Sequence, residues 1–165
     1  MTRWLVCGML GLVAVSCRDP VHDDAVDALG PEAPDVEQGP LHRPGQPCTA
    51  CHGGDGPGGP TFDLAGTVYA FPGAPNPLPG GIVRVVDGSG RSSAVQTNEV
   101  GTFYWLEGQL DLEFPIWASV EFCGRVVEMK TPIFRERSCA NCHSGPGPSS
   151  VEHVYFAESP EKVCQ

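Results

Sequence analysis

Residues 62–71 decide the fold. Their sequence, FDLAGTVYAF, is rich in aromatic and β-branched side chains, which fit the pleated surface of a β-sheet. Prolines and glycines interrupt the chain over residues 72–81, and a second apolar run, Ile82–Val86, ends at the turn sequence DGSG of residues 87–90. Short β-prone runs that alternate with turn residues predict strands joined by tight loops.

The same pattern continues along the chain. We expect five further strands, at residues 92–97, 101–106, 116–122, 125–129 and 151–157. Short strands at this spacing are typical of a β-sandwich, so the predicted fold is all-β: a seven-stranded β-sandwich with Gly/Pro-rich loops. The 21 glycines and 17 prolines exclude a helical bundle or coiled coil, because both residue types break helix interiors.

A family resemblance appears in three stretches of this region: AGTVYAF at 65–71, PLPGGIVRVVDGSGR at 77–91 and TNEVGTFYW at 97–105. They resemble the carboxypeptidase regulatory-like and Cna-B type (transthyretin-like) β-sandwich domains, and the resemblance covers residues 62–107. It implies a β-sandwich that serves as a stalk, spacer or adhesion module. It brings no catalytic residues with it.

The N-terminus carries the pattern of an export signal. Residues 1–16 combine a basic start at Arg3 with an apolar run that is too short to span a bilayer, which is typical of a secretory signal peptide. The sequence AVSC of residues 14–17 resembles a bacterial lipobox and predicts lipidation of Cys17; ordinary cleavage after Ser16 without a lipid is the alternative. We therefore expect the protein in the bacterial cell envelope, lipid-anchored to a membrane and facing the periplasm or the cell surface.

Residues 17–47 are predicted to form a disordered, lipidated acidic tether. They are rich in Asp, Glu and Pro and have no apolar periodicity, so they lack the surface that a segment must bury in order to fold. The expected segments after the tether are a first motif loop at 48–60, the β-sandwich core at 61–132, a second motif loop at 133–150, and a final strand and C-terminal tail at 151–165.

The chemistry lies in two short motifs, Cys48-Thr49-Ala50-Cys51-His52 and Cys139-Ala140-Asn141-Cys142-His143. Both have the pattern C-x-x-C-H, the attachment signature of c-type haem. Two thiols three positions apart can reach the two vinyl groups on one edge of the porphyrin, and the adjacent histidine can ligate iron. Both motifs also continue as H-x-G-x-G-P. The sequence thus predicts two covalent haems, with Cys48, Cys51, Cys139 and Cys142 as thioether positions and His52 and His143 as proximal ligands.

Three other interpretations of the motifs stay open. Four cysteines in two C-x-x-C pairs have the right number for one tetrahedral zinc ion. The pairs also fit two tight disulfides or one redox pair, although the strand–helix context of thioredoxin-type motifs is missing. A vestigial site that holds nothing is the third interpretation.

Distal ligands are sought among the remaining histidines and methionines. His42 precedes the first motif and His153 follows the second, and neutral imidazole is a good iron ligand. If haem is bound, His42 and His153 are therefore the candidate distal ligands. Considered alone, His42 is a solvated tether residue and His153 a strand-face residue. His22 lies in the acidic tether, and Met129 is expected in the core.

Cys123 and Cys164 belong to neither motif. In an exported protein the simplest interpretation is a disulfide, with free thiols as the alternative. If the strands alternate in direction, the first and the seventh run the same way. Both motif loops then lie at one end of the sandwich, and Cys123 and Cys164 meet at the other.

The sequence favours an exported dihaem c-type electron-transfer protein built on a β-sandwich, with redox proteins of the cell envelope as partners. Catalysis is not expected, since neither a nucleophile–base pair nor paired carboxylates are evident. A formal net charge of −10 argues against a nucleic acid partner. The alternative function is a non-redox cell-surface β-sandwich, an interaction or spacer module whose C-x-x-C pairs form disulfides or a structural zinc site.

Overall fold

The structure, a computed structural model, describes residues 19–73, 76–145 and 150–165. The predicted signal peptide at 1–16 and the predicted lipidation site Cys17 lie outside the described residues. Over the described ranges, no helix has the length and apolar character that crossing a membrane requires.

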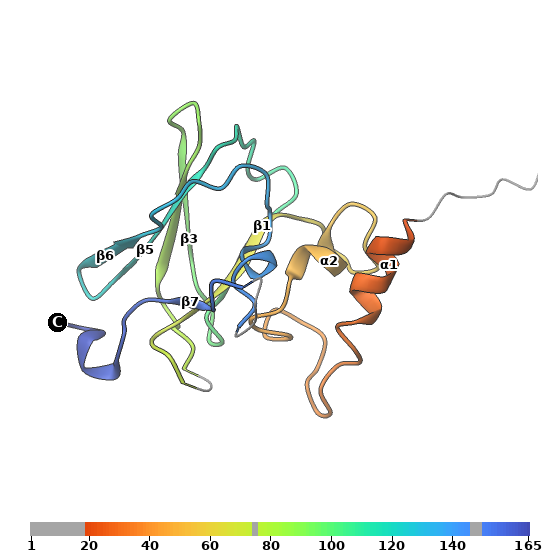
Figure 1. The fold of residues 1–165 in the computed structure, drawn as a ribbon, viewed down its shortest axis with the longest axis horizontal. Coiled ribbons are helices and arrows are strands. Elements are labelled where there is room, and N and C mark those ends of the chain that lie inside the picture. Colours follow the sequence, from red (N-terminus) through yellow and green to blue (C-terminus); the bar gives the residue numbers. More distant parts are fainter. Residues whose placement is uncertain (1–18, 74–75, 146–149) are drawn as a thin grey trace, which may run out of the picture.

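In the described part of the chain, seven strands form two sheets (Figure 1). A three-stranded sheet has the order β4-β1-β7 and is built from β1 (Phe62–Tyr69), β4 (Thr102–Leu106) and β7 (Val154–Tyr155). A four-stranded sheet has the order β3-β2-β5-β6 and is built from β2 (Ile82–Val86), β3 (Ser92–Gln96), β5 (Trp117–Phe122) and β6 (Arg125–Glu128). The predicted β-rich class and the number of strands are confirmed.

Strand β1 is the centre of the three-stranded sheet. It pairs antiparallel with β4 and parallel with β7, where Val68 lies opposite Val154. The first and seventh strands therefore run the same way, as predicted. The last strand is shorter than the expected 151–157, although the backbone N–H groups of Phe156 and Ala157 still donate to Tyr69 and Ala70 at 2.9 Å each.

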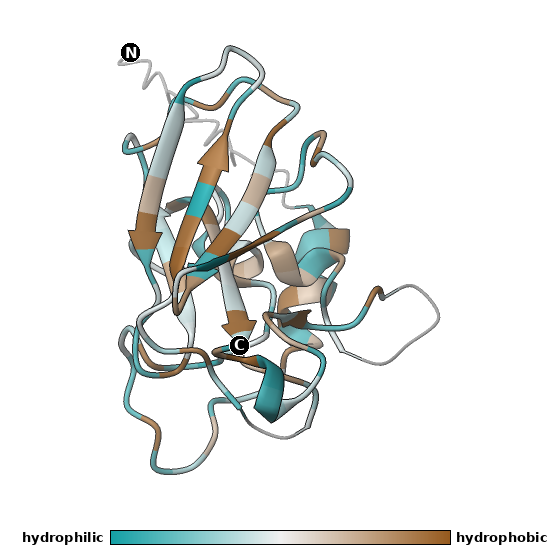
Figure 2. Cartoon of the chain, turned by 90° about the vertical axis from the view of Figure 1, so that its left-hand side faces the viewer, coloured by the Kyte–Doolittle hydropathy of each residue, from teal (hydrophilic) through white to brown (hydrophobic). Residues whose placement is uncertain are grey.

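The hydrophobic core draws on both sheets. The three-stranded sheet contributes Leu64, Val68 and Phe103, and the four-stranded sheet contributes Val83 and Val120, among others. Figure 2 shows one strand of the front sheet with a hydrophilic band between two hydrophobic stretches, as expected where successive side chains point to opposite faces. Apolar burial on alternating positions is what lets the sequence pattern predict these strands.

The segment before the first motif, where the sequence predicts a disordered tether, has a defined conformation in the structure over residues 19–47. Asp19 caps the N-terminus of helix α1 (Pro20–Asp27): its side chain accepts hydrogen bonds from two backbone N–H groups of the first turn. Farther along, the backbone N–H of Gly45 donates to Thr67 Oγ1 at 2.9 Å, and the side-chain amide of Asn98 donates to the carbonyl of Pro40 at 2.6 Å. Polar bonds of this kind hold the segment in place, and apolar periodicity does not report them.

Both motifs contain helix where loops were predicted. The first forms the one-turn helix α2 (Cys48–His52), which lies between α1 and β1 in Figure 1. The second begins with the 3-10 turn η1 (Cys139–Asn141), after which the N–H of His143 donates to the carbonyl of Cys139 at 2.8 Å. Helical turns bring the two cysteines of each motif to the same side of the backbone. A further 3-10 turn, η2 (Pro160–Lys162), lies near the C-terminus.

Candidate functional site

The two motifs meet at strand β1. Helix α2 packs against β1, and the chain just before η1 runs beside its edge, where the N–H of Ala65 donates to the carbonyl of Arg137 at 2.9 Å. Each motif opens into its own cavity, and the two cavities lie on opposite faces of the three-stranded sheet. Thr102, Tyr104 and Leu106 line the first, whereas Phe103 lines the second, and alternate residues of one strand face opposite ways.

The first site is a cavity of about 660 Å³ on the face of this sheet that is turned away from the core. Its volume lies within the range of about 300–1,000 Å³ that is typical of ligand pockets. The cavity brings together all four predicted residues of the first motif region: Cys48, Cys51, His52 and His42. The sequence placed His42 in a tether, but the ordered segment folds it over the motif.

His52 is fixed in the wall of the first site. Its side chain is buried, and its ring stacks on Phe62 at a centroid distance of 4.3 Å; Phe62 in turn stacks on Tyr104. The His52 Nδ1 lies 2.8 Å from the carbonyl oxygen of Pro60, and because a carbonyl only accepts, Nδ1 carries the proton. The Nε2 atom of a neutral His52 is therefore left free to ligate a metal.

His42 faces His52 across this cavity. The two ring centroids are 5.7 Å apart. The planes of the two rings are inclined by 66°. Two imidazoles this close together at one cavity could both contribute to a single iron site.

Glu32 and Arg43 hold His42, and sequence reasoning missed both of them. Glu32 Oε1 lies 3.1 Å from His42 Nδ1 and also accepts a hydrogen bond from Arg43 Nε at 2.9 Å. Arg43 donates further bonds to the carbonyls of Leu29 and Gly30 and to the side chain of Gln46. The hydrogen bond from Arg43 lowers the pKa of Glu32, so this acceptor is a carboxylate at neutral pH. No local sequence signal marks either residue, since their roles arise only from the folded segment.

The second site is a cavity of about 710 Å³ that reaches between the two sheets. Leu64, Val68 and Phe103 line it from one sheet, and Val83 and Val120 line it from the other. The predicted site residues around the cavity are Cys139, Cys142, His143 and His153.

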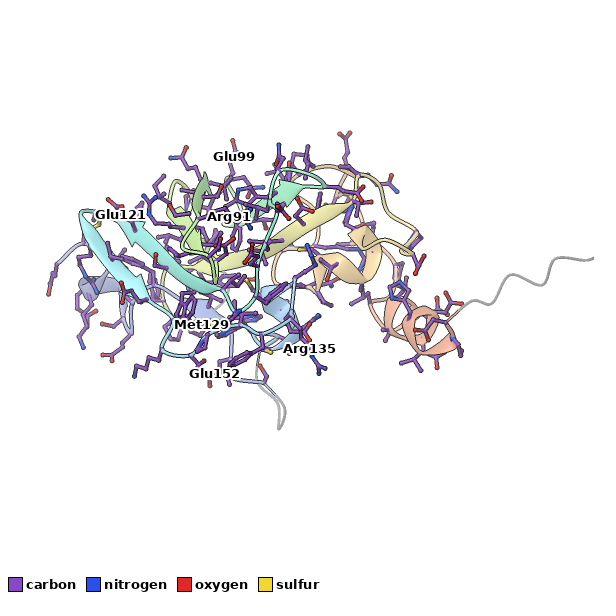
Figure 3. All side chains as sticks on the ribbon, turned by 90° about the horizontal axis from the view of Figure 1, so that it is seen from above. Arg91, Glu99, Glu121, Met129, Arg135 and Glu152 are labelled. Atoms are coloured by element: carbon purple, nitrogen blue, oxygen red, sulfur yellow. A yellow bond between two sulfur atoms is a disulfide. The ribbon has the colours of Figure 1, made fainter. Side chains whose placement is uncertain are left out.

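Two further residues of the second site stand out. Ser138 Oγ is buried and, among the described residues, has no hydrogen-bond partner. A buried hydroxyl of this kind needs an acceptor or donor that the protein itself does not supply. Met129 is half-buried and lines the same cavity, although the sequence suggested a core role for it. Figure 3 shows Met129, Arg135 and Glu152 along one side of the molecule.

Backbone carbonyls orient the histidines of the second site. His143 Nδ1 donates to the carbonyl of Glu152 at 2.8 Å, and His153 Nδ1 donates to the carbonyl of His143 at 3.2 Å. The His153 ring also packs against Tyr69, with centroids 4.8 Å apart. This ring borders both motif regions, because Gly45 precedes the first motif and a Cβ atom added there would lie 3.4 Å from it.

The four motif cysteines are free thiols in the structure. Burial raises the pKa of Cys48 to about 11, and burial together with the nearby Cys48 raises that of Cys139 to about 12. Cysteines of thioredoxin-type redox pairs have lowered pKa values, so the shift runs against a redox pair. Within the described ranges, no group of three or more His, Cys, Asp or Glu side chains is arranged to hold a metal ion.

Cys123 and Cys164 form a disulfide, as predicted. Their sulfur atoms are 2.04 Å apart and their Cα atoms 5.3 Å apart. Arg125 reinforces the link by donating to the carbonyls of Lys162 and Val163. Figure 1 shows the C-terminus beside β6, on the side away from α2, so this pair lies apart from the motif cysteines.

Comparison of the chain with protein-family models, with curated proteins and with solved structures gives no match. The resemblance of residues 62–107 to regulatory-like β-sandwich domains therefore stays a prediction. The geometry of the two sites carries the functional argument.

Proposed function

We propose that this chain is a dihaem c-type electron-transfer protein in which a seven-stranded β-sandwich carries one haem on each face of its three-stranded sheet. Cys48 and Cys51 hold the first haem, and Cys139 and Cys142 hold the second. His52 and His143 are the proximal iron ligands. The protein is exported, lipid-anchored at Cys17 to a membrane of the bacterial cell envelope, and exchanges electrons with other redox proteins there. It is not an enzyme.

One observation carries this proposal: the rings of His42 and His52 lie close together, at a centroid distance of 5.7 Å, in a cavity that both cysteines of the first motif also line. Each histidine uses its Nδ1 atom in a hydrogen bond, which leaves Nε2 for a metal. A disulfide between Cys48 and Cys51 gives no reason for a second, oriented histidine at that place.

The residues of the chain hold, orient and shield the cofactor. The bound haem iron supplies the redox chemistry by taking up and releasing one electron. At the first site the thiols attach the porphyrin edge, and the Pro60 carbonyl fixes the tautomer of His52. At the second site the largely apolar cavity that reaches between the sheets would hold the porphyrin, and the unpartnered Ser138 Oγ is available to a polar edge of the cofactor.

The proposal is tested by producing the full chain in a bacterium with a cytochrome c maturation system. We expect a Soret absorption band and a mass increase of two haems. Cys48→Ser with Cys51→Ser should remove one haem, and Cys139→Ser with Cys142→Ser should remove the other. A colourless protein with unmodified motif thiols would instead support the non-redox spacer module. The lipid anchor is tested with labelled fatty acid, which should be incorporated into the wild-type chain and not into Cys17→Ser.

The distal ligands are tested by spectroscopy. His42→Ala should convert one haem from low-spin to high-spin while leaving it attached, because only the distal bond is removed. His22→Ala is the matched control, since His22 lies on α1 and lines neither cavity. At the second site His153→Ala and Met129→Ala decide between the two candidates. Unchanged spectra in both His42→Ala and His153→Ala would refute the predicted bis-histidine assignment.

A further inference from the structure

We propose that Glu32, fixed by Arg43, is a positioning residue for His42 and makes the first site the lower-potential one of the two. This inference rests on the proposed function. It concerns residues that neither the C-x-x-C-H motif nor its spacing identifies.

The first step is geometric. Glu32 Oε1 is shared by two donors, His42 Nδ1 at 3.1 Å and Arg43 Nε at 2.9 Å. These three side chains are largely withdrawn from solvent, with exposures of 29% for Glu32, 25% for His42 and 17% for Arg43. Arg43 is itself held by bonds to the carbonyls of Leu29 and Gly30. The carboxylate is therefore fixed against His42 even though the segment around it has little apolar packing.

The second step is chemical. A carboxylate that accepts the Nδ1–H bond of a ligating histidine fixes the ring and raises its basicity. A more basic ligand favours the oxidised metal, which carries the higher charge, and so lowers the reduction potential. Because the positive charge of Arg43 lies next to the negative charge of Glu32, the two charges largely cancel at longer range. The effect of Glu32 on the iron therefore acts through the hydrogen bond to His42 and stays confined to the first site.

The third step is the comparison with the second site. There His143 Nδ1 donates to the carbonyl of Glu152 and His153 Nδ1 to the carbonyl of His143, both of which are neutral acceptors. The chain thus supplies a charged acceptor at one site and neutral acceptors at the other. Two haems with the same attachment motif should therefore differ in potential, with the lower potential at His42.

The experiment is a potentiometric titration of the full dihaem chain, followed by its absorption spectrum. Glu32→Gln keeps an oxygen acceptor for His42 and removes the charge. It should change the equilibrium constant for reduction of one haem about tenfold. For a one-electron couple this raises the potential of that redox wave by about 59 mV. The low-spin spectrum should persist, because His42 still ligates. Glu32→Ala removes the acceptor and should add a high-spin fraction.

Glu152→Gln is the matched control. It also removes one negative charge beside a predicted iron ligand, but its backbone carbonyl, not its side chain, accepts from His143. It should leave the lower-potential wave in place. The chain with Cys139→Ser and Cys142→Ser, which keeps only the first attachment site, should show the lower-potential wave alone.

The outcomes separate this inference from the function on which it rests. Suppose that haem is attached at both motifs. If the lower-potential wave then shifts equally in Glu32→Gln and Glu152→Gln, or does not shift in Glu32→Gln, the role of Glu32 is overturned and the proposed function still stands. A higher-potential wave in the chain that retains only the first site would do the same. A wild-type chain without attached haem would overturn both.

Discussion

At the scale of single residues, Gly66 decides how close the second motif comes to the sheet. It lies in the middle of β1, where a Cβ atom would stand 2.8 Å from Cys139 Sγ and 2.9 Å from the Phe103 ring. Real Cβ atoms do not approach other atoms so closely, and packed cores do not give way freely. A glycine at this position is therefore a condition for the burial of Cys139.

The first prediction concerns this contact. Gly66→Ala should lower the free energy of unfolding by about 1–3 kcal/mol, as overpacking of a core does, and should reduce haem attachment at the second motif while sparing the first. Urea titration and intact mass measure the two effects. Gly54→Ala is the control, since nothing lies within 4 Å of its added Cβ. Equal stability and equal loading of the Gly66 and Gly54 variants would show that Cys139 needs no such space.

Asp87 is the other residue with a predicted effect. Its side chain is buried, and its carboxylate accepts hydrogen bonds from Ser89, from Arg91 and from the backbone N–H of Glu113. Burial opposes ionisation of Asp87, but these hydrogen bonds outweigh it and hold the pKa well below its usual range. The carboxylate thus ties the turn after β2 to residues far along the chain.

The second prediction follows from the sign of this shift. Since the pKa of Asp87 is lower in the folded than in the unfolded protein, its stabilising effect is full above the unfolded value of about 3.9 and is lost as the pH falls toward the folded value. Asp87→Asn should lower stability at neutral pH and flatten the loss between about pH 4 and about pH 2. Urea midpoints across this range measure it. Glu99→Gln, at an exposed position (Figure 3), should behave as wild type; an equal acid slope in Asp87→Asn would contradict the assignment.

At the scale of elements, the strands were predictable and the helices were not. β2 shows why: Val83 and Val85 are buried while Arg84 between them is exposed, a period-two pattern that local sequence reports directly. Helix α1 had a local signal in Asp19 followed by Pro20, an N-cap and a first-turn proline. That signal is short and stands in a segment whose acidic, proline-rich composition favours disorder. The polar contacts that anchor the segment appear only in three dimensions.

The third prediction concerns the hairpin of β5 and β6 and the C-terminal tail. Their disulfide, Cys123–Cys164, joins positions separated by 41 in the sequence, and the chain-entropy model gives about 4 kcal/mol for such a loop. Cys123→Ser and Cys164→Ser should each lower the free energy of unfolding by about that amount, and the double variant should lose no more than either. Urea unfolding measures this; additive losses would show that each cysteine acts separately.

The tail offers a second measurement of the same bond. Trypsin should cut after Lys162 faster in both variants than in the wild type, because the disulfide and Arg125 are what hold this stretch. Lys130 is exposed and lies away from the bond, so cleavage after it is the internal control. An unchanged rate at Lys162 would mean that Arg125 alone anchors the tail.

At the scale of the whole molecule, the sequence identified the candidate site residues but not the places where they meet. The repeated motif identified the four cysteines and the candidate proximal histidines, and its spacing from His42 and His153 identified the candidate distal ligands; all of these residues line the two cavities. The number and direction of the strands predict at which end of a sheet a loop lies, but not on which face of the sheet. The position of the two sites on opposite faces of one sheet was therefore not predictable from the strand count. Glu32 and Ser138 were missed because only the folded structure marks them. Glu32 is distinguished by its tertiary hydrogen bond to His42, and Ser138 by a buried hydroxyl that has no partner among the described residues.

The whole molecule also divides into a core and a covering segment. All members of the hydrophobic core cluster, with the partly buried residues packed on it, lie between Leu64 and Val163. The covering segment, residues 19–46, reaches the sheets through hydrogen bonds such as that from Gly45 to Thr67 and that from Asn98 to Pro40. The sheets should therefore fold without this segment, whereas the first site should not be complete without it.

The last prediction tests that division with a chain that lacks residues 19–46 and keeps the first motif. It should retain the strand signal in far-ultraviolet circular dichroism, because the apolar core is untouched, and should lose about 2 kcal/mol for the two hydrogen bonds named above. Both haems should still attach, but the first should become high-spin, as in His42→Ala, because the same distal ligand is gone. The second haem serves as the internal control and should keep the spectrum that it has in the wild type. A first haem that stays low-spin would place its distal ligand elsewhere, and a chain that no longer folds would show that the covering segment belongs to the core.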